Sequence, residues 1–579
     1  MTEKPLIEIK NLSISFGTGE NKVRAVKNLN YSVPKGKTVG IVGESGSGKS
    51  LTSLSIMGLL HPAAKIESGE IYFDHFGSTI SLLDLSDEEM RQYRGNEIAM
   101  IFQEPMTSLN PVIKCGEQVA EALRLHKKLS KKEAKLKTIE WFNEVQLPRP
   151  EQIYESYPHQ ISGGQKQRVM IAMAMCCEPQ LLIADEPTTA LDVTVQKTIL
   201  ELIKALQIKH NMSVIFITHD LGVVAEIADE VVVMKSGEKV ESNKTSSLFE
   251  NPQHPYTKGL LACRPPMDFR LKSLPTVEDF LSLNEDQAID RFLSQLKVSE
   301  KEQKDDLNKV LERPKLIEIK NLKTYFPIQK GLFRKTVGYV KAVDDVSFHV
   351  HEGETLGLVG ESGCGKTTLG RSILRLIEPT SGSVKYKGTD INSIGNNEMR
   401  SLRKDLQIIF QDPYSSLNPR MKIGNAILEP MQVHKIESNN TIRKEKVIDL
   451  METVGLNADQ FNRYPHEFSG GQRQRVCIAR TLALSPKFII CDESVSALDV
   501  SVQAQVLNLL NELKNKFSFT YIFISHDLSV AKYMSDRMIV MKDGQIEELG
   551  VAEDIYRNPQ SDYTKTLIEA IPRVDFANF

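Results

Sequence analysis

Short apolar runs recur along this chain, and each stops abruptly at polar or charged residues. The stretch "KTVGIVGESGSGKSLTSLSIMGLL" (37–60) has the pattern of a short strand, a Gly-rich turn and a helix. The runs "QLLIADEP" (180–187) and "KFIICDES" (487–494) each end in paired acids. Such runs are typical of buried parallel strands, whose carboxyl ends open on a ligand site. The pattern therefore predicts an α/β fold with polar chemistry at the strand ends.

The pattern occurs twice along the chain. "YPHQISGGQKQRVMIA" returns as "YPHEFSGGQRQRVCIA", a phrase of sixteen residues. The repeated phrases begin, in the first and second copy, at Leu6 and Leu316, Gly43 and Gly360, Ile101 and Ile409, Tyr157 and Tyr464, and Thr218 and Ser525. An internal duplication of this extent predicts two domains, at 1–265 and 314–579. The second copy is longer before its Gly-rich loop, in "PIQKGLFRKTVGYV".

The segment between the copies, 266–313, is predicted to be a linker. It is rich in mixed charge and contains no Gly after Met267, which argues against a flexible Gly/Ser tether. Apolar residues from Ile289 to Leu296 recur at helical spacing after the capping candidate Asn284. We expect a short amphipathic helix here, docked rather than free.

Composition narrows the class of protein. At 579 residues the chain is too long for one hydrophobic core. The formal net charge of −3 gives no overall field that would draw the chain to nucleic acid. The seven cysteines show no metal-ligand spacing and are predicted to be reduced thiols. No apolar run approaches the roughly 18–20 residues that span a bilayer, and the N-terminus lacks a secretory signal pattern.

The two Gly-rich loops have the P-loop pattern in its required strand–turn–helix context. Glycines let consecutive backbone N–H groups point at phosphate oxygens, and the following helix adds its positive end. Lys49 and Lys366 would contact the β/γ-phosphates, while the hydroxyls of Ser50 and Thr367 would ligate Mg²⁺. The predicted ATP-binding loop residues are Gly43, Glu44, Ser45, Gly46, Ser47, Gly48, Lys49 and Ser50, and Gly360, Glu361, Ser362, Gly363, Cys364, Gly365, Lys366 and Thr367.

The paired acids divide into two predicted roles. Asp185 and Asp492 should hold Mg²⁺, directly or through water. Glu186 and Glu493 follow them and are suited to orient and deprotonate the attacking water. The alternative is that these acids only cap helices at the ends of strands.

Histidine and glutamine also follow apolar strands in both copies. His219 and His526, which come after "SVIFIT" and "TYIFIS", are candidates for a γ-phosphate contact. Gln103 and Gln411 are candidates for contact with the metal or the lytic water. The alternative for each is an ordinary hydrogen-bonded polar residue.

P-loop, glutamine, "SGGQ", acidic strand, "ALD" and histidine occur in this order in both halves, and this order resembles the nucleotide-binding domains of ABC ATPases. The resemblance covers nearly the whole chain except the linker. It implies two tandem P-loop NTPase domains, each with a RecA-like α/β core, an antiparallel β subdomain and a helical subdomain. It also implies ATP and Mg²⁺ as cofactors.

In that family "SGGQ" serves the nucleotide bound by the partner domain, so the resemblance implies head-to-tail pairing of the halves. Lys49 and Glu186 would then work with one signature, and Lys366 and Glu493 with the other. The signature residues are Ser469, Gly470, Gly471 and Gln472 for the first site, and Ser162, Gly163, Gly164 and Gln165 for the second. The alternative is that "SGGQ" is an ordinary loop at the start of a helix.

Two local features remain open. The resemblance assigns adenine stacking to Phe16 and Phe326, although Tyr325 competes and either ring could be core. Cys364 stands where the first loop has Ser47. Its position near a helix N-terminus and Lys366 favours a reactive thiolate that nucleotide would shield. The alternative is an inert side chain pointing away from the nucleotide.

One smaller difference lies beside the chemistry. Pro187 follows the first glutamate, whereas Ser494 follows the second and could loosen its turn. Every polar group needed for hydrolysis is present in both copies, so both sites are expected to be competent.

Phrases outside the ATP chemistry resemble the oligopeptide/dipeptide importer family. They are "FQEPMTSLNP" and "FQDPYSSLNP", and the C-terminal phrases "NPQHPYTKGLLACRP" and "NPQSDYTKTLIEAIP". "FPIQKGLF" and "HPAAKIESGEIYFD" resemble the two ATPase subunits of such importers, so the chain looks like both subunits fused. We expect no iron–sulfur cluster, because Cys263 is alone near its segment.

The resemblance implies partners: two permease subunits that differ from each other and an extracytoplasmic solute-binding protein. The chain would then sit at the cytoplasmic face of the membrane, without spanning it. The stretches Met106–Asn110 and Tyr414–Asn418 and the helical inserts, the first of which holds Trp141, would receive the permeases. The alternative function is a soluble tandem ABC ATPase acting on ribosomes or DNA. A long basic arm, a zinc-type Cys cluster and net positive charge, which would favour it, are absent from the sequence.

Overall fold

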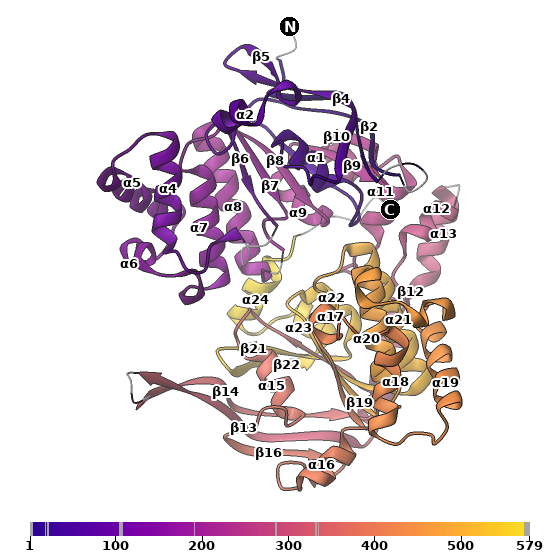
Figure 1. Cartoon of the computed structure of the whole chain (residues 1–579). Helices are drawn as coiled ribbons and strands as arrows, with labels where there is room; N and C mark the ends of the chain where they lie inside the picture. The colour runs from indigo at the N-terminus through magenta and orange to yellow at the C-terminus, as the bar shows by residue number, and fades with distance from the viewer. Residues whose placement is uncertain are drawn as a thin grey trace.

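The computed structural model describes residues 4–17, 19, 22–103, 108–189, 191–283, 286–330, 333 and 335–572. Two similar bodies are stacked, the first in indigo to magenta and the second in salmon to yellow (Figure 1). No helix within the described ranges is both long and apolar enough to cross a bilayer. The predicted α/β fold is confirmed in both halves.

The first half is built on a six-stranded sheet in the order β10-β9-β3-β8-β7-β6. All neighbouring strands are parallel except the edge pair β9 and β10. The strands are β3 (Thr38–Val42), β6 (Ile98–Ile101), β7 (Leu181–Asp185), β8 (Ser213–Thr218), β9 (Glu230–Lys235) and β10 (Glu238–Lys244). Every residue of β3, β7 and β8 is buried, as their apolar runs predict.

A second, antiparallel sheet covers this core in the order β2-β1-β4-β5. Its strands are β1 (Ile7–Phe16), β2 (Val23–Val33), β4 (Ala64–His75) and β5 (Ser78–Ser81). Ile7, Leu29 and Phe73 of this sheet share one apolar cluster with Ile41 and Ile183 of the parallel sheet. This packing places the Gly-rich loop between the two sheets.

Helices complete the first half. Those of the core are α1 (Lys49–Ile56), α2 (Asp87–Tyr93), α8 (Val193–His210) and α9 (Leu221–Ile227). A separate helical group consists of α4 (Cys115–His126), α5 (Lys131–Glu144), α6 (Pro150–Glu155) and α7 (Gly163–Met175). Trp141 and Phe142 are buried in this group, so the only tryptophan belongs to its core and not to its exposed face.

The second half repeats these layers. Its six-stranded sheet has the order β18-β19-β20-β15-β21-β22, and its four-stranded sheet β14-β13-β16-β17. The strands are β13 (Lys315–Lys330), β14 (Lys335–His351), β15 (Thr355–Val359), β16 (Ser381–Tyr386), β17 (Thr389–Asp390), β18 (Leu406–Ile409), β19 (Phe488–Asp492), β20 (Thr520–Ile524), β21 (Arg537–Lys542) and β22 (Gln545–Val551). The helices are α15 (Lys366–Ile373), α16 (Asn396–Leu402), α17 (Pro413–Ser416), α18 (Ile423–Val433), α19 (Asn440–Thr453), α20 (Gly470–Leu482), α21 (Val500–Phe517) and α22 (Leu528–Met534). The extra residues of this copy lengthen β13 and β14 into a hairpin that projects beyond the sheet (Figure 1).

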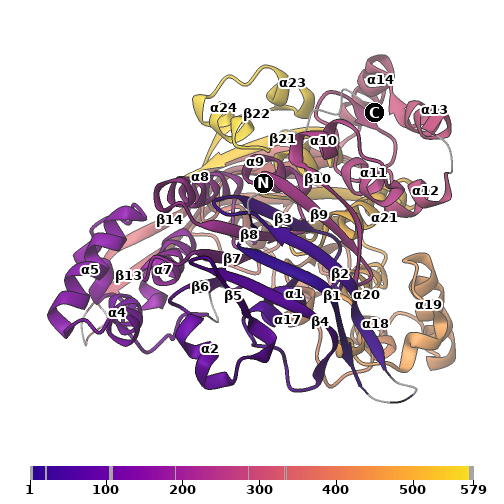
Figure 2. The same ribbon diagram turned by 90° about the horizontal axis from the view of Figure 1, so that it is seen from above.

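The two halves are arranged head to tail. Figures 1 and 2 both show the helical group α4–α7 of the first half and the helices α18 and α19 of the second at opposite sides of the molecule. The projecting hairpin of the second half lies on the same side as the helical group of the first. Each half therefore presents its core to the helical side of the other.

Each half ends in two short helices after its last strand: α10 (Thr245–Glu250) and α11 (Pro255–Ala262), and α23 (Ala552–Arg557) and α24 (Asp562–Glu569). The intervening segment contains β11 (Arg270–Leu271), α12 (Val277–Ser282), α13 (Asp286–Leu296), β12 (Lys297–Val298) and α14 (Glu300–Leu311). The capping candidate Asn284 lies outside the described residues. Ile289 on α13 is buried.

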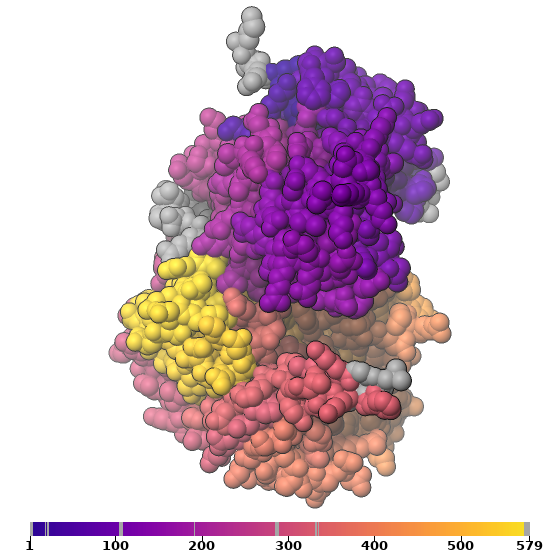
Figure 3. Space-filling view, turned by 90° about the vertical axis from the view of Figure 1, so that its left-hand side faces the viewer, coloured from indigo at the N-terminus to yellow at the C-terminus, as the bar shows by residue number. Residues whose placement is uncertain are grey.

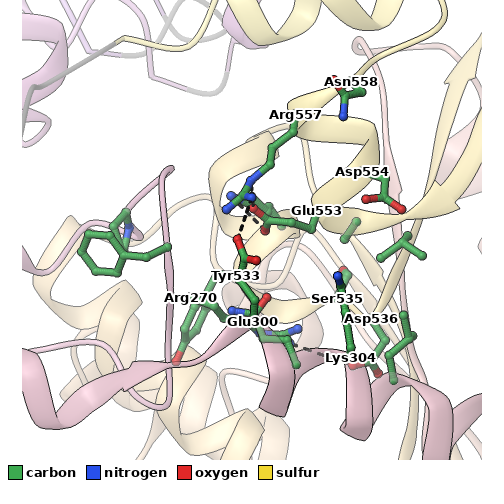
Figure 4. A pocket seen from close by; sticks show the side chains of 17 residues that line it. Arg270, Glu300, Lys304, Tyr533, Ser535, Asp536, Glu553, Asp554, Arg557 and Asn558 are labelled. Carbon is green, nitrogen blue, oxygen red and sulfur yellow. Dashed lines mark hydrogen bonds and ion pairs between the residues drawn. The ribbon is translucent and has the colours of Figure 1, made fainter.

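This intervening segment is attached to the second half. Glu300 pairs with Arg557 at 3.0 Å, and the ammonium of Lys532 donates to the carbonyl of Met267. Glu300, Lys532 and Arg557 border a cavity of about 370 Å³, where Arg557 points between Glu553 and Glu300 (Figure 4). The acidic and basic side chains around this cavity are largely paired with one another. These ion pairs hold the segment against α22 and α23.

Candidate nucleotide sites

The two Gly-rich loops have the same tight curl. Gly43 has φ +154°, and a Cβ there would lie 2.1 Å from the carbonyl oxygen of Met234. The Lys49 ammonium donates to the carbonyls of Gly43 at 2.7 Å and Glu44 at 2.9 Å. Lys366 repeats these bonds in the second loop at 2.7 and 2.9 Å. Each lysine ammonium is therefore fixed by two carbonyls of its own loop, the loop whose N–H groups are predicted to bind phosphate.

The first helical residues face the acid of the neighbouring strand. The Ser50 hydroxyl donates to the Asp185 carboxylate at 3.1 Å, and the Thr367 hydroxyl donates to Asp492 at 2.8 Å. Burial, with the negative charge of Glu186 adding to it, raises the pKa of Asp185 to about 6.

This pair of groups fits one side of a magnesium site. Hydroxyl and carboxylate oxygens are ligands that Mg²⁺ prefers, and the ion usually takes its remaining ligands from water and phosphate. The described residues contain no cluster of three or more His, Cys, Asp or Glu side chains suited to a metal. An ion here would thus depend on nucleotide and water for most of its shell.

The glutamate after β7 is the centre of a hydrogen-bonded group. Gln103 and Thr189 each donate to the Glu186 carboxylate at 3.0 Å, and Nδ1 of His219 lies 3.3 Å from it. Burial alone would raise the pKa of Glu186, but the bonds and charge of His219, with Thr189 and Lys49, bring it to about 2. Glu186 has φ 48°, in the left-handed region, so the backbone turn aims its side chain back at the loop.

The second half repeats this group with one bond fewer. Gln411 donates to Glu493 at 2.9 Å and His526 lies 3.3 Å away, while Glu493 has φ 47°. Ser494 therefore leaves the turn unchanged. The hydroxyl of Ser496, however, donates to the backbone carbonyl of Glu493 and not to its carboxylate. The first carboxylate accepts a hydroxyl bond that the second lacks.

The "ALD" phrases join the halves. Asp192 caps α8 by accepting the N–H of Val195 at 2.9 Å, and its other oxygen accepts the N–H of Ser362 from the opposite loop at 3.2 Å. Asp499 caps α21 and accepts the N–H of Ser45 at 2.9 Å. From the sequence, these phrases are notable only for their place in the motif order. The one sequence signal for their contact with the opposite loop is an acid directly before a helix in both copies.

The "SGGQ" phrases form the starts of α7 and α20. The Ser162 side chain accepts the N–H of Gln165, whose own side chain accepts the N–H of Ser162. Ser469 and Gln472 repeat this capping box. A Cβ at Gly164 would lie 2.9 Å from the Val195 side chain, so this glycine lets α7 approach α8. Within the described chain, no hydrogen bond joins either signature serine to the opposite loop, and their part in the sites remains a prediction.

The aromatic candidates do not line the cavity found beside the second loop. A cavity of about 210 Å³ beside that loop is lined by Ser362, Lys366, Glu493, His526 and, from the first half, Asp192. Ala342 lines it, but Phe326 does not. Tyr325 donates to Asp344 and is engaged elsewhere. Phe16 is half-buried at the end of β1.

The thiol of Cys364 does not match the reactive form considered from the sequence. The residue is 6% exposed, and its Sγ faces Gly360 inside the loop. Burial raises the pKa of the Cys364 thiol even though Lys366 acts in the opposite direction. Burial and the raised pKa argue against an exposed, low-pKa thiolate and favour the inert alternative.

The stretches proposed to receive other subunits are only partly described. Met106 and Thr107 lie outside the described residues. Tyr414 is exposed on α17, with the Arg473 guanidinium 5.1 Å from its ring centre.

Comparison with known proteins identifies related sequences along the whole chain. The ABC transporter family model matches residues 26–189 and 343–496. The model for the oligopeptide/dipeptide transporter C-terminal region matches 240–286 and 548–578. The glutathione import ATP-binding protein GsiA of Pectobacterium atrosepticum is 47% identical over 578 residues, which cover 99% of this chain and 91% of that protein. The GsiA protein of Escherichia coli is 47% identical over 569 residues, covering 98% and 89%.

Solved structures of single cassettes also match. A dimeric post-hydrolysis state of the ATP-binding cassette MJ0796 is 27% identical and covers 41% of this chain and 98% of that chain, with a TM-score of 0.37.

Replacing both glutamates should separate ATP binding from hydrolysis. The double variant Glu186→Gln, Glu493→Gln should bind ATP normally but turn it over about 10²- to 10⁴-fold more slowly, the typical loss for a positioned base. Turnover is measured by phosphate release and binding by equilibrium titration. Near-normal hydrolysis by the double variant would show that the base is wrongly assigned.

The crossing carboxylates permit a matched test of head-to-tail pairing. Asp→Asn keeps an oxygen for the helix cap but places an amide against the opposite loop. Lys49→Ala combined with Asp499→Asn disables one site, so the second change should add little to the loss of ATPase activity. Lys49→Ala with Asp192→Asn strikes both sites and should be more severe. Equal activity in the two double variants would contradict the pairing.

Thiol labelling checks the burial of Cys364. In the native chain a maleimide should label Cys364 slowly, at a rate unaffected by Mg-ATP, because the sulfur faces the inside of the loop. The variant Ser47→Cys should behave alike, since Ser47 is equally buried. Mass spectrometry over a time course measures both rates. Rapid labelling that nucleotide slows would restore the reactive thiolate.

Proposed function

We propose that this chain is the ATPase subunit that drives import of glutathione or a similar short peptide. The premise is its family: the chain belongs to the ABC transporter family and carries the oligopeptide/dipeptide transporter C-terminal region in both halves. The observation that carries this proposal is the similarity to importer ATPases over nearly the full chain, including both C-terminal segments. The alternative of a ribosome- or DNA-directed ATPase gains no support from these relatives.

Hydrolysis would proceed at two composite sites. In the first, Lys49 and the loop N–H groups would hold the phosphates, and Ser50 and Asp185 would hold Mg²⁺, whose positive charge would offset the negative charge of the phosphates. Glu186 accepts a proton from the attacking water, and Gln103 and His219 fix its carboxylate. Lys366, Thr367, Asp492, Glu493, Gln411 and His526 take these roles in the second site.

ATP would draw the halves together because each phosphate loop already bonds to the opposite half. Asp499 and Asp192 supply these bonds. We assign the signatures that begin at Ser162 and Ser469 to closing over the opposite nucleotide. In this proposal domains 1–265 and 314–579 are the two motor units, joined by 266–313.

The partners proposed are two permease subunits and an extracytoplasmic solute-binding protein, with the chain at the cytoplasmic face of the membrane. The halves differ in sequence where they would meet a permease, with Met106 in the first and the exposed Tyr414 in the second, and the second also has the longer β13–β14 hairpin. Two unlike docking surfaces on one chain suit two non-identical permeases.

Reconstitution tests the cargo and the partners together. The chain should co-purify with two membrane proteins. With the solute-binding protein on the opposite side, the complex in proteoliposomes should transport labelled glutathione or dipeptide when ATP is present on the side of this chain. The Glu186→Gln, Glu493→Gln variant is the control and should abolish uptake. Recovery of ribosomes in place of membrane proteins would contradict the importer proposal.

A further inference from the structure

The C-terminal segment of each half touches the phosphate loop of its own half through one tyrosine hydroxyl. The N–H of Glu44 donates to the Tyr256 hydroxyl at 3.1 Å, and the N–H of Glu361 donates to the Tyr563 hydroxyl at 3.1 Å. Both glutamates directly follow the first glycine of their loop. The same bond, at the same length, thus occurs independently in two copies.

The two segments keep this tyrosine while the residues before it differ. His254 caps α11 by accepting the N–H of Tyr256, and Ser561 caps α24 by accepting the N–H of Tyr563. A cationic side chain also lies over each ring, Lys235 at 5.1 Å in the first case and Lys542 at 4.9 Å in the second. The unlike phrases "HPYT" and "SDYT" therefore place the ring in the same way.

The far end of each segment is attached to the opposite half. Asn508 on α21 accepts the N–H of Leu274 and donates to its carbonyl, both at 2.8 Å, and Leu274 is buried. At the end of α24, the carbonyl of Glu569 accepts the Lys197 ammonium of α8 at 3.2 Å. In Figure 3 the yellow C-terminal part lies directly against the purple and magenta first half.

The helices reached in this way are the two that begin with the crossing carboxylates. Asp499 begins α21 and accepts the N–H of Ser45, and Asp192 begins α8 and accepts the N–H of Ser362. The loop glutamates add a third contact across the interface. Ser501 donates to the Glu44 carboxylate at 2.5 Å, and Thr194 donates to that of Glu361 at 2.8 Å.

We propose that the C-terminal segments, residues 254–274 and 561–571, act as straps, each fixing the phosphate loop of its own half to the leading helix of the opposite half. Tyr256 and Tyr563 are then positioning residues for the two nucleotide sites. Because each strap is bonded to the loop at one end and to the opposite half at the other, a separation of the halves would displace the loop. ATP is therefore bound tightly only when the helix of the opposite half, α21 or α8, is in contact with the strap. The inference rests on the proposed function only in requiring ATP at both sites.

The two straps differ in strength. The first has a buried tyrosine and two partly buried amide bonds to Leu274, while the second has a half-buried tyrosine and ends in a single solvent-exposed bond from Lys197. Bonds that are partly shielded from water hold more firmly than bonds that water competes for. The first loop is therefore the more firmly held of the two.

The test removes only the hydroxyls, in the full chain with Glu186→Gln and Glu493→Gln to prevent turnover. Titration with a fluorescent ATP analogue should show two sites. Tyr256→Phe should weaken one of them by about 3- to 10-fold, the range for one lost hydrogen bond, and Tyr563→Phe should weaken the other. In the hydrolysing chain the same variants should raise KM with kcat changed by less than about twofold.

Tyr31→Phe is the matched control, because the Tyr31 hydroxyl is buried with no hydrogen-bond partner among the described residues. It should leave both affinities unchanged. Unchanged affinity in Tyr256→Phe and Tyr563→Phe, with only a lower Tm, would overturn the positioning role. Because binding is measured on this chain alone, failure of the cargo or permease proposal would appear in uptake and not in this titration.

A double-variant cycle tests the strap itself. Asn508→Ala should weaken ATP binding at the same site as Tyr256→Phe. Because both changes cut the same strap, the double variant should bind ATP as tightly as whichever single variant binds it less tightly. Asn515→Ala, at an exposed position of the same helix, is the control and should leave ATP affinity unchanged. Additive effects of Asn508→Ala and Tyr256→Phe, or no effect of Asn508→Ala, would overturn the strap.

Discussion

The two halves of this chain are joined at their phosphate loops by two carboxylates, Asp192 and Asp499, each of which caps a helix in one half and accepts an N–H from the phosphate loop of the other. One side chain thus ties the start of a helix to a backbone group across the interface. Because the carboxylate has two oxygens, it satisfies both donors at once. Any motion that separates the halves must break charge-assisted bonds at both loops together.

This constraint explains why the chain contains two copies of the same domain. Each half carries a loop, an acid pair and a capping aspartate, but its own aspartate serves the opposite loop. The Glu44 and Glu361 side chains reinforce the same crossing through Ser501 and Thr194. The two halves are still not equivalent, because Thr189 donates to the Glu186 carboxylate while Ser496 donates to the backbone carbonyl of Glu493. The symmetry is therefore one of topology, with local differences in how firmly each group is held.

Much of the fold could be predicted because its signals are local. Apolar runs ending in acids predicted β7 and β19, and a Gly-rich turn before a helix predicted the loops around Lys49 and Lys366. What failed depended on distant neighbours. Cys364 has the local setting of a reactive thiol, but it is buried in an apolar cluster that includes Met541, 177 positions later in the chain.

The tyrosine contacts could not be predicted for the same reason. Tyr256 meets Glu44 across 212 positions of sequence, and no local pattern records that bond. Its recurrence at Tyr563 was visible only as part of a shared phrase. Patterns in a single sequence predict periodicity and turns well, but they do not predict which hydroxyl accepts a hydrogen bond from the backbone N–H of a distant loop.

The length of chain between paired residues also sets an order of assembly during synthesis. Ser45 waits for Asp499, which lies 454 residues later, whereas Ser362 meets Asp192, already made 170 residues earlier. Domains emerge and fold from the N-terminus at about 5–20 residues per second. The first phosphate loop is therefore finished early but stays without its partner for roughly half a minute or more. A chain whose synthesis stops within the second half, before Asp499, would therefore hold a first phosphate loop without the carboxylate that accepts the Ser45 N–H.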